Sequence, residues 1–282
     1  MTEAAIDHAP STSAGPGEPL TGIRAITIDF GNTLVRVSRA SLRAVVELAS
    51  ERSTAALGLG APDAFLAAWH EERERQFRDD LPRHREVDLH ERAIRVLARL
   101  RGFGPPALDE PWDDTAAATR SRPDEVEHVV ESYSRAFLEL VPPMDGATSV
   151  LEGLATRGFR LAILSNWPLA RTIDEYAARA GWERHLAGIY VSQRIGTIKP
   201  QRQIFEVAAA GLATPPAHLL HVGDDWAADV VGARDAGWRV AYLRDHQVDT
   251  PLPTSDRAAG VQPDLELDHL TELPARVADP IP

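Results

Sequence analysis

The chain contains 282 residues, of which 44% are hydrophobic, and it has a formal net charge of −12 with an isoelectric point near 5.3. This length allows one large domain or two smaller ones, and the acidic balance argues against binding to nucleic-acid phosphates. The sequence has no cysteine and no apolar run approaching about eighteen residues, which argues against disulfides, thiolate metal ligands and a transmembrane helix, so we expect a cytoplasmic protein.

Residues 1–21 are rich in proline, glycine, serine and acidic residues and lack an apolar segment, so we expect a disordered tail and no signal peptide. The following segment, IRAITIDF at 23–30, is a short apolar run that ends in Asp29 and is followed by a Gly-Asn break. Such a run predicts a buried strand that delivers one carboxylate to its C-terminal end. Ligands bind at that end of the strands in open α/β sheets.

The interval 38–142 contains no strand signals. Several of its stretches have the periodicity of amphipathic helices, among them SLRAVVELASERSTAAL, APDAFLAAWHEERERQF, ERAIRVLARLRG and PDEVEHVVESYSRAFLEL. In the last of these, apolar residues recur at spacings of three and four, which places them on one helical face. We therefore expect a helical cap domain over 38–142, inserted between the first strand and the rest of the chain.

Beyond residue 143, short apolar runs alternate with helical patterns. The predicted strands are FRLAILSN (159–166), AGIYVSQ (187–193), LLHVGDD (219–225), RVAYLRD (239–245) and, more weakly, PDLELDHL (263–270). Runs of this kind, bounded by Gly, Pro or Asp, are typical of parallel strands that are buried on both faces. The alternation predicts an α/β fold with a doubly wound, mainly parallel Rossmann-like sheet, formed by the discontinuous core 22–37 and 143–282.

Polar side chains follow each of the strands that carry chemistry, at the point where the strand ends. In chain order they are Asp29 and Thr33, Ser165 and Asn166, Lys199, and then Asp224, Asp225 and Asp229. Because neighbouring parallel strands present their carboxyl ends at the same edge of a sheet, we expect these groups to meet in one crevice. They provide a carboxylate nucleophile, hydroxyl and amide donors for phosphoryl oxygens, one ammonium and a group of carboxylates. This set is typical of phosphoryl transfer.

Positive charge is needed at such a site, because an ionised phosphate repels an attacking carboxylate. A Mg²⁺ ion held by oxygen ligands would supply part of it, and Lys199 the rest. Lys199 is the only lysine among thirty basic residues, all others being arginine. A coding bias explains the general preference for arginine, but the retained lysine indicates a place where a compact ammonium cannot be replaced by a planar guanidinium.

These motifs resemble those of the haloacid dehalogenase (HAD) superfamily, in the subfamily with a helical cap inserted after the first motif. DFGNT resembles the first motif, LSNWP the second, GTIKPQRQIF the third and HVGDDWAADVVGARDAGW the fourth. The resemblance implies Asp29 as nucleophile, Ser165 and Lys199 as phosphoryl contacts, and Mg²⁺ bound by Asp29, Asp224 and the carbonyl of Gly31. It also implies that Asp229 supports the metal site or Lys199, whereas Asp225 stands where the family usually has Ser or Thr.

One position departs from the pattern of the family's phosphatases. They usually carry a second aspartate two residues after the nucleophile, which protonates the leaving oxygen and then deprotonates water, and here that position is Gly31. Such general acid–base catalysis typically contributes about 10²–10⁴-fold. Candidate replacements in the predicted cap are His70, Glu71, His84 and Glu86. Its arginines at 73, 75, 78, 83 and 85 could attract an anionic substrate, although charges on helices usually face solvent.

Four functions are compatible with these observations. The first is a Mg²⁺-dependent hydrolase that acts on a small phosphorylated substrate through an aspartyl phosphate. The second is a 2-haloacid dehalogenase, which also lacks the second aspartate, but the carboxylates of the fourth motif would repel a haloacid. The third is phosphonate cleavage, which requires a lysine in the cap that is absent here. The fourth is a weakly catalytic or non-catalytic binding or regulatory protein; the substrate and the oligomeric state cannot be inferred from the sequence.

Overall fold

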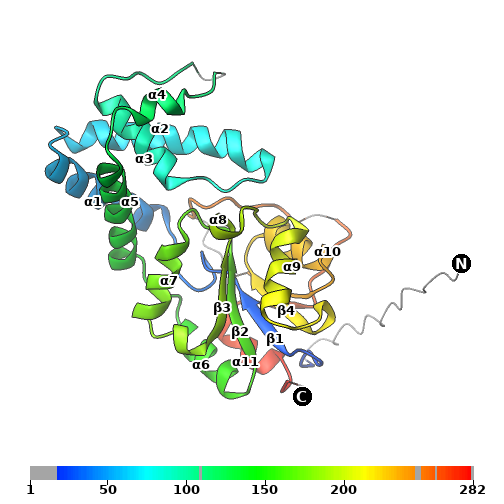
Figure 1. The fold of residues 1–282 in the computed structure, drawn as a ribbon. Coiled ribbons are helices and arrows are strands. Elements are labelled where there is room, and N and C mark those ends of the chain that lie inside the picture. The colour runs from blue at the N-terminus through cyan, green and yellow to red at the C-terminus, as the bar shows by residue number, and fades with distance from the viewer. Residues whose placement is uncertain (1–17, 108–109, 245–248, 258, 281–282) are drawn as a thin grey trace, which may run out of the picture.

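Among the described residues, six parallel strands form one sheet in the order β3-β2-β1-β4-β5-β6, of which β1 to β4 are labelled in Figure 1. The computed structural model describes residues 18–107, 110–244, 249–257 and 259–280. The strands are β1 (Ala25–Ile28), β2 (Arg160–Ser165), β3 (Leu186–Val191), β4 (Leu219–Gly223), β5 (Arg239–Leu243) and β6 (Leu265–Leu267). All four residues of the central strand β1 are buried, as expected for a strand covered on both faces. The predicted α/β fold with a parallel sheet is confirmed.

Helices cover both faces of the sheet, and each face has its own apolar core. The helices of the sheet region are α6 (Ala147–Thr156), α7 (Ala170–Arg179), α8 (Ser192–Ile195), α9 (Arg202–Gly211), α10 (Gly232–Asp235) and α11 (Leu273–Arg276). Buried side chains of α6 and α7 belong to one core, and those of α9 and α10 to the other, which is a doubly wound arrangement. The shorter helical segments are η1 (Leu81–Arg83), η2 (Glu183–His185), η3 (Pro216–His218), the π-helical η4 (Trp226–Val231) and η5 (Leu270–Glu272).

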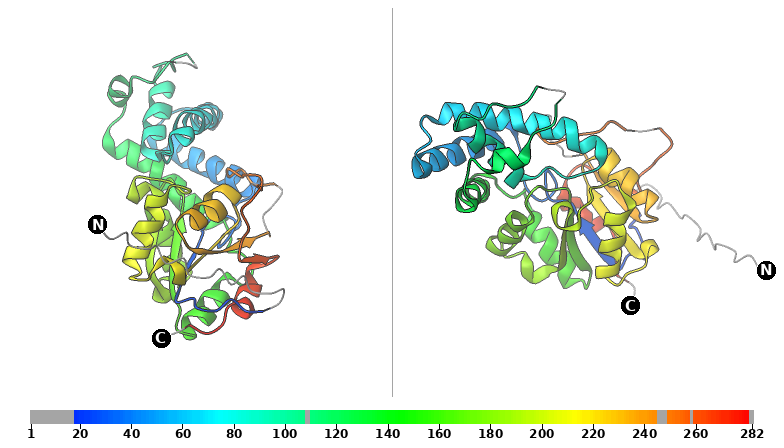
Figure 2. Two further views of the ribbon diagram at one scale, coloured as in Figure 1. Left: turned by 90° about the vertical axis from the view of Figure 1, so that its right-hand side faces the viewer. Right: turned by 45° about the horizontal axis from the view of Figure 1, so that its top comes forward.

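Five α-helices stand between β1 and α6 in the described chain, and we call them, with the segments that connect them, the helical insertion. They are α1 (Arg39–Leu57), α2 (Pro62–Asp80), α3 (Leu89–Leu100), α4 (Asp114–Ala118) and α5 (Pro123–Leu140). Local signals set their ends: Ser38 caps α1 in a reciprocal pair with Ser41, and Gly58 ends it with a φ of 63°. The insertion lies beyond the carboxyl ends of the strands (Figures 1 and 2).

The insertion shares its apolar core with one face of the sheet. Buried residues of α1, α2, α3 and α5 belong to the same cluster as Ile26 and Ile28 of β1. Helix α5 packs along α1 and also contacts α7 of the sheet region. The division of the chain into a core domain and a cap domain stays a prediction, because this core is continuous from one part to the other.

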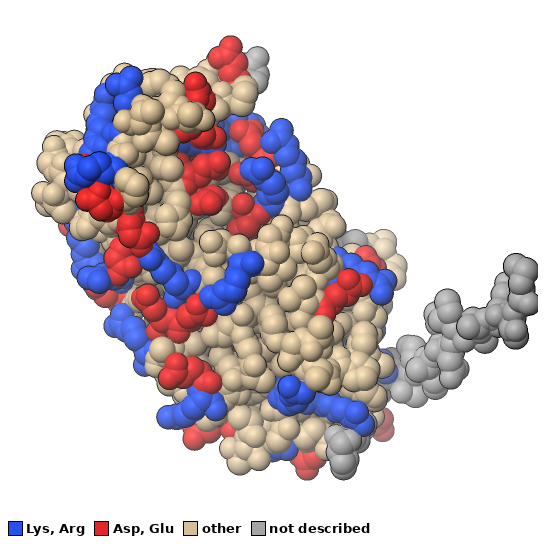
Figure 3. Space-filling model, in the orientation of Figure 1, with Lys and Arg blue, Asp and Glu red and all other residues tan. Residues whose placement is uncertain are grey.

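The described chain begins inside the predicted tail. Residues 1–17 lie outside the described residues, but Leu20 is buried and forms a parallel bridge with Val277. Leu20, which the sequence assigned to the tail, therefore packs against the C-terminal part of the chain. Among the described residues, no helix has both the length and the apolar character needed to span a membrane. On the face shown in Figure 3, basic and acidic side chains are intermixed.

Candidate active site

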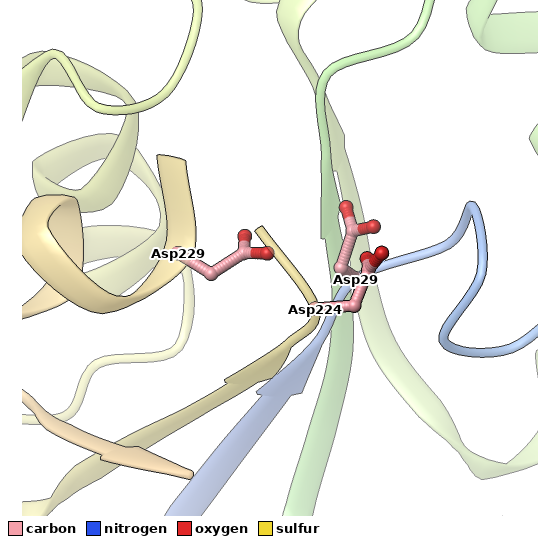
Figure 4. Close-up of side chains that lie close together, drawn as sticks. All are labelled: Asp29, Asp224 and Asp229. Atoms are coloured by element: carbon pink, nitrogen blue, oxygen red, sulfur yellow. The ribbon is translucent and has the colours of Figure 1, made fainter. Parts of the chain in front are cut away.

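The carboxyl ends of three neighbouring strands bring the predicted residues together. Asp29 follows β1 directly, Ser165 is the last residue of β2, and Asp224 follows β4. Because β1 lies between β2 and β4, these three side chains meet at the centre of the sheet edge. Carboxylate oxygens of Asp29, Asp224 and Asp229 lie within 4.8 Å of one another, with Asp229 directed toward the other two from η4 (Figure 4). The expected crevice is thus present.

Lys199 lies between two of these carboxylates. Its ammonium Nζ donates to Oδ1 of Asp29 at 2.8 Å, to Oδ1 of Asp229 at 2.5 Å and to the carbonyl of Leu164 at 3.1 Å. Burial by itself would lower the pKa of Lys199, but the charges of Asp229 and Asp29 outweigh it and raise the pKa above its usual value. All three ammonium protons have acceptors, so the site is filled by a compact cation that remains charged at neutral pH.

Asp229 is held by a buried network of its own. Its Oδ1 accepts from Lys199 and from Nε2 of His221 at 2.9 Å, and its Oδ2 accepts from the backbone N–H of Asp225 at 2.9 Å. Burial alone would raise the pKa of Asp229, but the ammonium of Lys199 and the hydrogen bond from His221 hold it well below the usual range. Both oxygens are occupied, so Asp229 is placed to position Lys199 rather than to bind a metal directly.

His221 was not identified from the sequence. It pairs across the sheet with Thr27 of β1, whose Oγ1 lies 2.8 Å from its Nδ1. Burial lowers the pKa of His221, so the imidazole is neutral, and Nε2–H donates to Asp229 while Nδ1 accepts from the threonine hydroxyl. The sequence signal for this pair was one polar residue, Thr27 or His221, inside each of two otherwise apolar strand segments.

Asp29 and Asp224 each have a carboxylate oxygen that accepts no hydrogen bond from the described residues. Among the described residues, Oδ2 of Asp29 has no hydrogen-bond partner, and Asp224 accepts only from the hydroxyl of Thr33, at 3.4 Å. Burial raises the pKa of Asp29, and burial with the repulsion of its neighbours raises that of Asp224 well above its usual value. Crowded, poorly partnered carboxylates of this kind fit a divalent cation with oxygen preference, because the cation relieves both the repulsion and the lack of partners.

The predicted phosphoryl donors are placed differently from one another. The Ser165 hydroxyl is buried and has no partner among the described residues, so it is available to a ligand in the crevice. Asn166 instead exchanges two hydrogen bonds with the backbone of Lys199, at 3.0 and 2.7 Å. Its amide therefore fixes the position of Lys199, a different use from the predicted contact with substrate. Thr33, as noted, donates to Asp224.

Asp225 organises the loop that follows the fourth strand. Its Oδ1 accepts from the backbone N–H of Ala228 at 2.7 Å, which caps η4, and from the hydroxyl of Ser255 at 2.9 Å. Ser255 in turn accepts from the N–H of Ala227 at 2.6 Å. Asp225 therefore fastens the segment 249–257, for which the sequence had suggested no function, beside the site.

The same segment occupies the space beside Gly31. A Cβ atom placed on Gly31 would lie 2.7 Å from Cδ1 of Leu252 and 3.4 Å from the ring of Trp167. Thr250 fixes this arrangement, since its hydroxyl accepts from the side chain of Asn32 at 2.9 Å. Two apolar side chains thus fill the region into which a residue-31 carboxylate would point.

A pocket of about 460 Å³ connects this site to the helical insertion. Asp29, Lys199 and Asp224 line one end, and residues of the insertion line the other, namely Arg73, Phe77, Leu81, His84, Glu86, Val87, Arg92 and Tyr133, with Leu42. Of the four candidate acids of the insertion, His84 and Glu86 contribute to its walls. The other two candidates, His70 and Glu71, do not line the pocket, and Glu71 pairs with Arg99 at the surface.

Of the five arginines noted in the sequence, only Arg73 lines this pocket among the described residues. The others are used elsewhere or exposed; Arg75, for example, is buried against Glu72 and donates to backbone carbonyls. Arg92 and Tyr133 were missed. The signal for Arg92 was its place on the apolar face of α3, three residues after Leu89 and four before Val96.

Glu86 connects the insertion to the sheet region. Its Oε2 accepts from the hydroxyl of Ser192 at 2.5 Å, and that hydroxyl accepts from the backbone N–H of Trp167 at 2.8 Å. Burial raises the pKa of Glu86 above its usual value. A carboxyl with a raised pKa is thus present in the wall of the pocket.

Comparison with known proteins agrees with this geometry. The family model "haloacid dehalogenase-like hydrolase" matches residues 23–237. A mouse haloacid dehalogenase-like hydrolase domain-containing protein 3 is 30% identical over 111 residues, which are 39% of this chain and 43% of that protein. A ribulose-1,5-bisphosphate 5-phosphatase of Halopiger xanaduensis is 29% identical over 154 residues, 54% of this chain and 64% of that protein. This chain thus spans well under two thirds of the first of these relatives.

Solved structures show the same fold. The 2-haloacid dehalogenase of Pseudomonas syringae superposes with a TM-score of 0.59 and 22% identity, and the match covers 89% of this chain and 96% of that one. At this identity the likeness concerns the fold alone, whereas the family model matches the segment that contains all four motifs. The chain belongs to the haloacid dehalogenase-like hydrolases.

Proposed function

We propose that the protein is a Mg²⁺-dependent phosphatase that acts on a small phosphorylated substrate through an aspartyl phosphate on Asp29. One observation carries the proposal: the Asp29 carboxylate is bound by the buried Lys199 ammonium and adjoins the carboxylate of Asp224, whose one hydrogen bond among the described residues comes from Thr33 at 3.4 Å. The relatives named for phosphatase activity support it, among them the ribulose-1,5-bisphosphate 5-phosphatase.

In the first step, Oδ2 of Asp29 attacks phosphorus, and the bond between phosphorus and the leaving oxygen breaks. The Ser165 hydroxyl donates to a phosphoryl oxygen, and the adjacent Lys199 ammonium stabilises the charge that develops through its own positive charge. In the second step, water attacks phosphorus, the bond to Asp29 breaks, and phosphate is released with the carboxylate restored. Bound by Asp29, Asp224 and the carbonyl of Gly31, Mg²⁺ would compensate the charge of the phosphate.

The proton for the leaving oxygen cannot come from residue 31, which has no side chain. Leaving groups that depart as anions need no donor, so aryl and acyl phosphates are the best substrates for the site as built. For alkyl phosphates, Glu86 is the best-placed donor in the insertion, because it lines the pocket and burial raises its pKa.

The geometry gives less support to the alternatives. Asp224 and Asp225 both face the pocket and would repel the carboxylate of a 2-haloacid. A purely non-catalytic protein has no need for a buried unpartnered hydroxyl at Ser165 or for a buried ammonium between two carboxylates. Gly31 agrees with a dehalogenase, but the neighbouring carboxylates of Asp29, Asp224 and Asp229 fit a cation better than an anionic haloacid.

The test is hydrolysis of p-nitrophenyl phosphate by the purified protein. We expect turnover with Mg²⁺, its loss after exhaustive chelation, and a decrease of at least about 10³-fold in Asp29→Asn. Asp63→Asn, which neutralises an exposed acid in the first turn of α2, is the matched control and should behave as the wild type. A metal-replete wild type that is inactive on aryl phosphates, or an active and folded Asp29→Asn, would refute the proposal.

A further inference from the structure

Arg92 is a buried cation in the wall of the pocket. Only 3% of its surface is exposed, because α3 directs it inward together with Leu89 and Val96. Its Nε donates to Oε1 of Gln76 at 2.9 Å, and its guanidinium lies 5.2 Å from the centre of the Trp69 ring. These two contacts fix the plane of the guanidinium without neutralising its charge.

Among the described residues, no carboxylate forms an ion pair with Arg92, and its two terminal nitrogens have no hydrogen-bond partner. The neighbouring arginines of the insertion differ: Arg95 pairs with Asp114 at 2.8 Å, and Arg99 pairs with Glu72 at 2.8 Å. Burial lowers the pKa of Arg92 to about 10, so it remains charged at neutral pH. A buried charge without a partner is costly, which makes this site a receptor for an anion.

The nearby acids are already in use. Glu72 accepts from Arg99 and from the indole N–H of Trp112 at 2.8 Å. Glu86 accepts from Ser192 and from the backbone N–H of Val87 at 3.1 Å. Neither carboxylate is therefore free to become the partner of Arg92 in this structure.

A second donor and a second cation stand beside Arg92. The Tyr133 ring stacks on Trp69 with centroids 5.4 Å apart, so one indole positions both the phenol and the guanidinium. No described residue hydrogen-bonds to the Tyr133 hydroxyl. Arg73 lines the same end of the pocket. Its Nη2 donates to the carbonyl of Pro251 at 2.6 Å, and its Nη1 pairs with the exposed Glu74 at 2.6 Å, so Arg92 is the cation of this end with which no described carboxylate pairs. The three side chains form an electropositive end opposite Asp29 and Lys199.

We infer that Arg92 and Tyr133, with Arg73, form a subsite for a second anionic group of the substrate, a carboxylate or a second phosphate. The inference rests on the proposed phosphatase function and narrows its substrate class to small phosphate esters with an anion at each end. Because Asp29 and Arg92 line the same pocket, one molecule can place its reacting phosphate at Asp29 and a second anion at Arg92.

Three substrates with one carbon skeleton test this subsite: 3-hydroxypropyl phosphate, 3-(phosphonooxy)propanoate and propane-1,3-diol bisphosphate. Two of these compounds carry an anion at each end, and the first carries a hydroxyl at the end away from its phosphate. We expect the wild type to prefer at least one of the two over the hydroxyl compound by about 10- to 100-fold in kcat/KM, mainly through a lower KM. Comparison of 3-(phosphonooxy)propanoate with propane-1,3-diol bisphosphate decides whether the second anion is a carboxylate or a phosphate.

For each variant the measured quantity is the ratio of kcat/KM for the compound with two anionic ends to kcat/KM for the hydroxyl compound. A general loss of activity lowers both values and cancels in this ratio. Arg92→Gln should reduce the preference to near 1, and Tyr133→Phe should reduce it by several fold. Arg92→Lys should retain part of it, since lysine keeps the charge but not the forked donors. Arg78→Gln removes an exposed arginine of α2 that pairs with Asp79, and it should leave the preference unchanged.

Thermal melts establish that each variant is folded. If Arg92→Gln does not fold, unchanged preferences in Arg92→Lys and Tyr133→Phe overturn the subsite, and reduced ones support it. A wild type that hydrolyses all three compounds equally also overturns it. A wild type that hydrolyses no phosphate ester refutes the phosphatase function instead. Whenever the wild type hydrolyses none of the three alkyl esters, calorimetric titration with propane-1,3-diol bisphosphate decides the subsite: binding weakened about 10-fold or more in Arg92→Gln supports it, and equal binding overturns it.

Discussion

At Gly31, the loop after β1 has no side chain, and Leu252 and Trp167 occupy the neighbouring space. The backbone itself does not demand glycine, because Gly31 does not have a positive φ, whereas the next residue, Asn32, has a φ of 56°. The obstacle to a carboxylate at this position is therefore its apolar surroundings and not strain in the chain.

This geometry leads to a prediction for Gly31→Asp. The single variant should gain little and melt at a lower temperature, because its Cβ displaces Leu252 and its carboxyl is buried among apolar groups. Gly31→Asp combined with Leu252→Ala provides room, and we expect it to accelerate alkyl phosphate hydrolysis by about 10²–10⁴-fold. The measurement is kcat on 3-hydroxypropyl phosphate, with p-nitrophenyl phosphate as the comparison that needs no proton. A folded double variant without any gain on the alkyl ester would contradict the prediction.

The residues at strand ends could be predicted from the sequence, and those brought in by tertiary packing could not. Asp29, Ser165 and Asp224 each follow a recognisable buried strand, so parallel pairing alone brings them together. Leu252 belongs to a segment with no periodicity, and tertiary hydrogen bonds of its neighbours Thr250, Pro251 and Ser255 place it over the first motif. Arg92 was hidden because an arginine on a helix is usually solvated, and its burial depends on packing against Trp69.

Among the elements, the contact between the insertion and the sheet region is of particular interest. Glu86 stands between η1 and α3, and Ser192 begins α8, so their hydrogen bond joins two parts of the chain that are far apart in sequence. Glu86 is half-buried, and the desolvation of its carboxyl raises its folded-state pKa above the ordinary value of 4.5.

The sign of the resulting pH dependence follows from that shift. Below pH 4.5 the Glu86 carboxyl is neutral and makes its full contribution to the free energy of unfolding. That contribution is lost as the pH rises through the folded-state pKa, because the ionised carboxylate is poorly solvated in the folded protein. Glu86→Gln stays neutral, so its melting temperature relative to the wild type should increase by a few degrees between pH 4.5 and pH 8. Glu51→Gln, at an exposed position of α1, should show no such trend. A Glu86→Gln difference that is constant with pH would show that the carboxyl is ionised throughout.

The elements themselves were predicted unevenly. The long helices of the insertion and the first five strands have strong periodic or apolar signals, and each was found close to its observed bounds. The five-residue α4 is too short for a periodic signal, and the π-helical η4 differs from an α-helix only in hydrogen bonding. The order of strands in the sheet follows from which face each crossover helix covers, and no single segment of sequence encodes that choice.

For the whole molecule, the carboxylates gathered at the sheet edge have an energetic cost. Asp224 is half-buried, and besides desolvation the charges of Asp29, Asp229 and Asp225 raise its pKa by repulsion. A chain with a net charge of −12 has little surplus positive charge to offset this locally. A bound divalent cation should therefore stabilise the fold as well as support the reaction.

Thermal unfolding tests this expectation. Mg²⁺ at a hundredfold excess over its Kd should stabilise the wild type by about 2.7 kcal/mol, relative to sodium chloride of equal ionic strength. Asp224→Asn should melt at a higher temperature than the wild type without metal, since a neutral amide removes the repulsion, and it should lose most of the response to Mg²⁺. If Asp224→Asn responds to Mg²⁺ as the wild type does, the cation binds elsewhere.

The single lysine has a practical consequence for spectroscopy. Feeding ¹⁵N-lysine during expression places one labelled side-chain amine in the entire molecule, and that nitrogen lies between Asp29 and Asp229. Its burial and its three acceptors slow proton exchange with water, which is the condition for observing an ammonium resonance. One signal, assigned by composition alone, would then follow the charge of the site through the addition of metal, the binding of phosphate analogues and the formation of a phosphorylated enzyme.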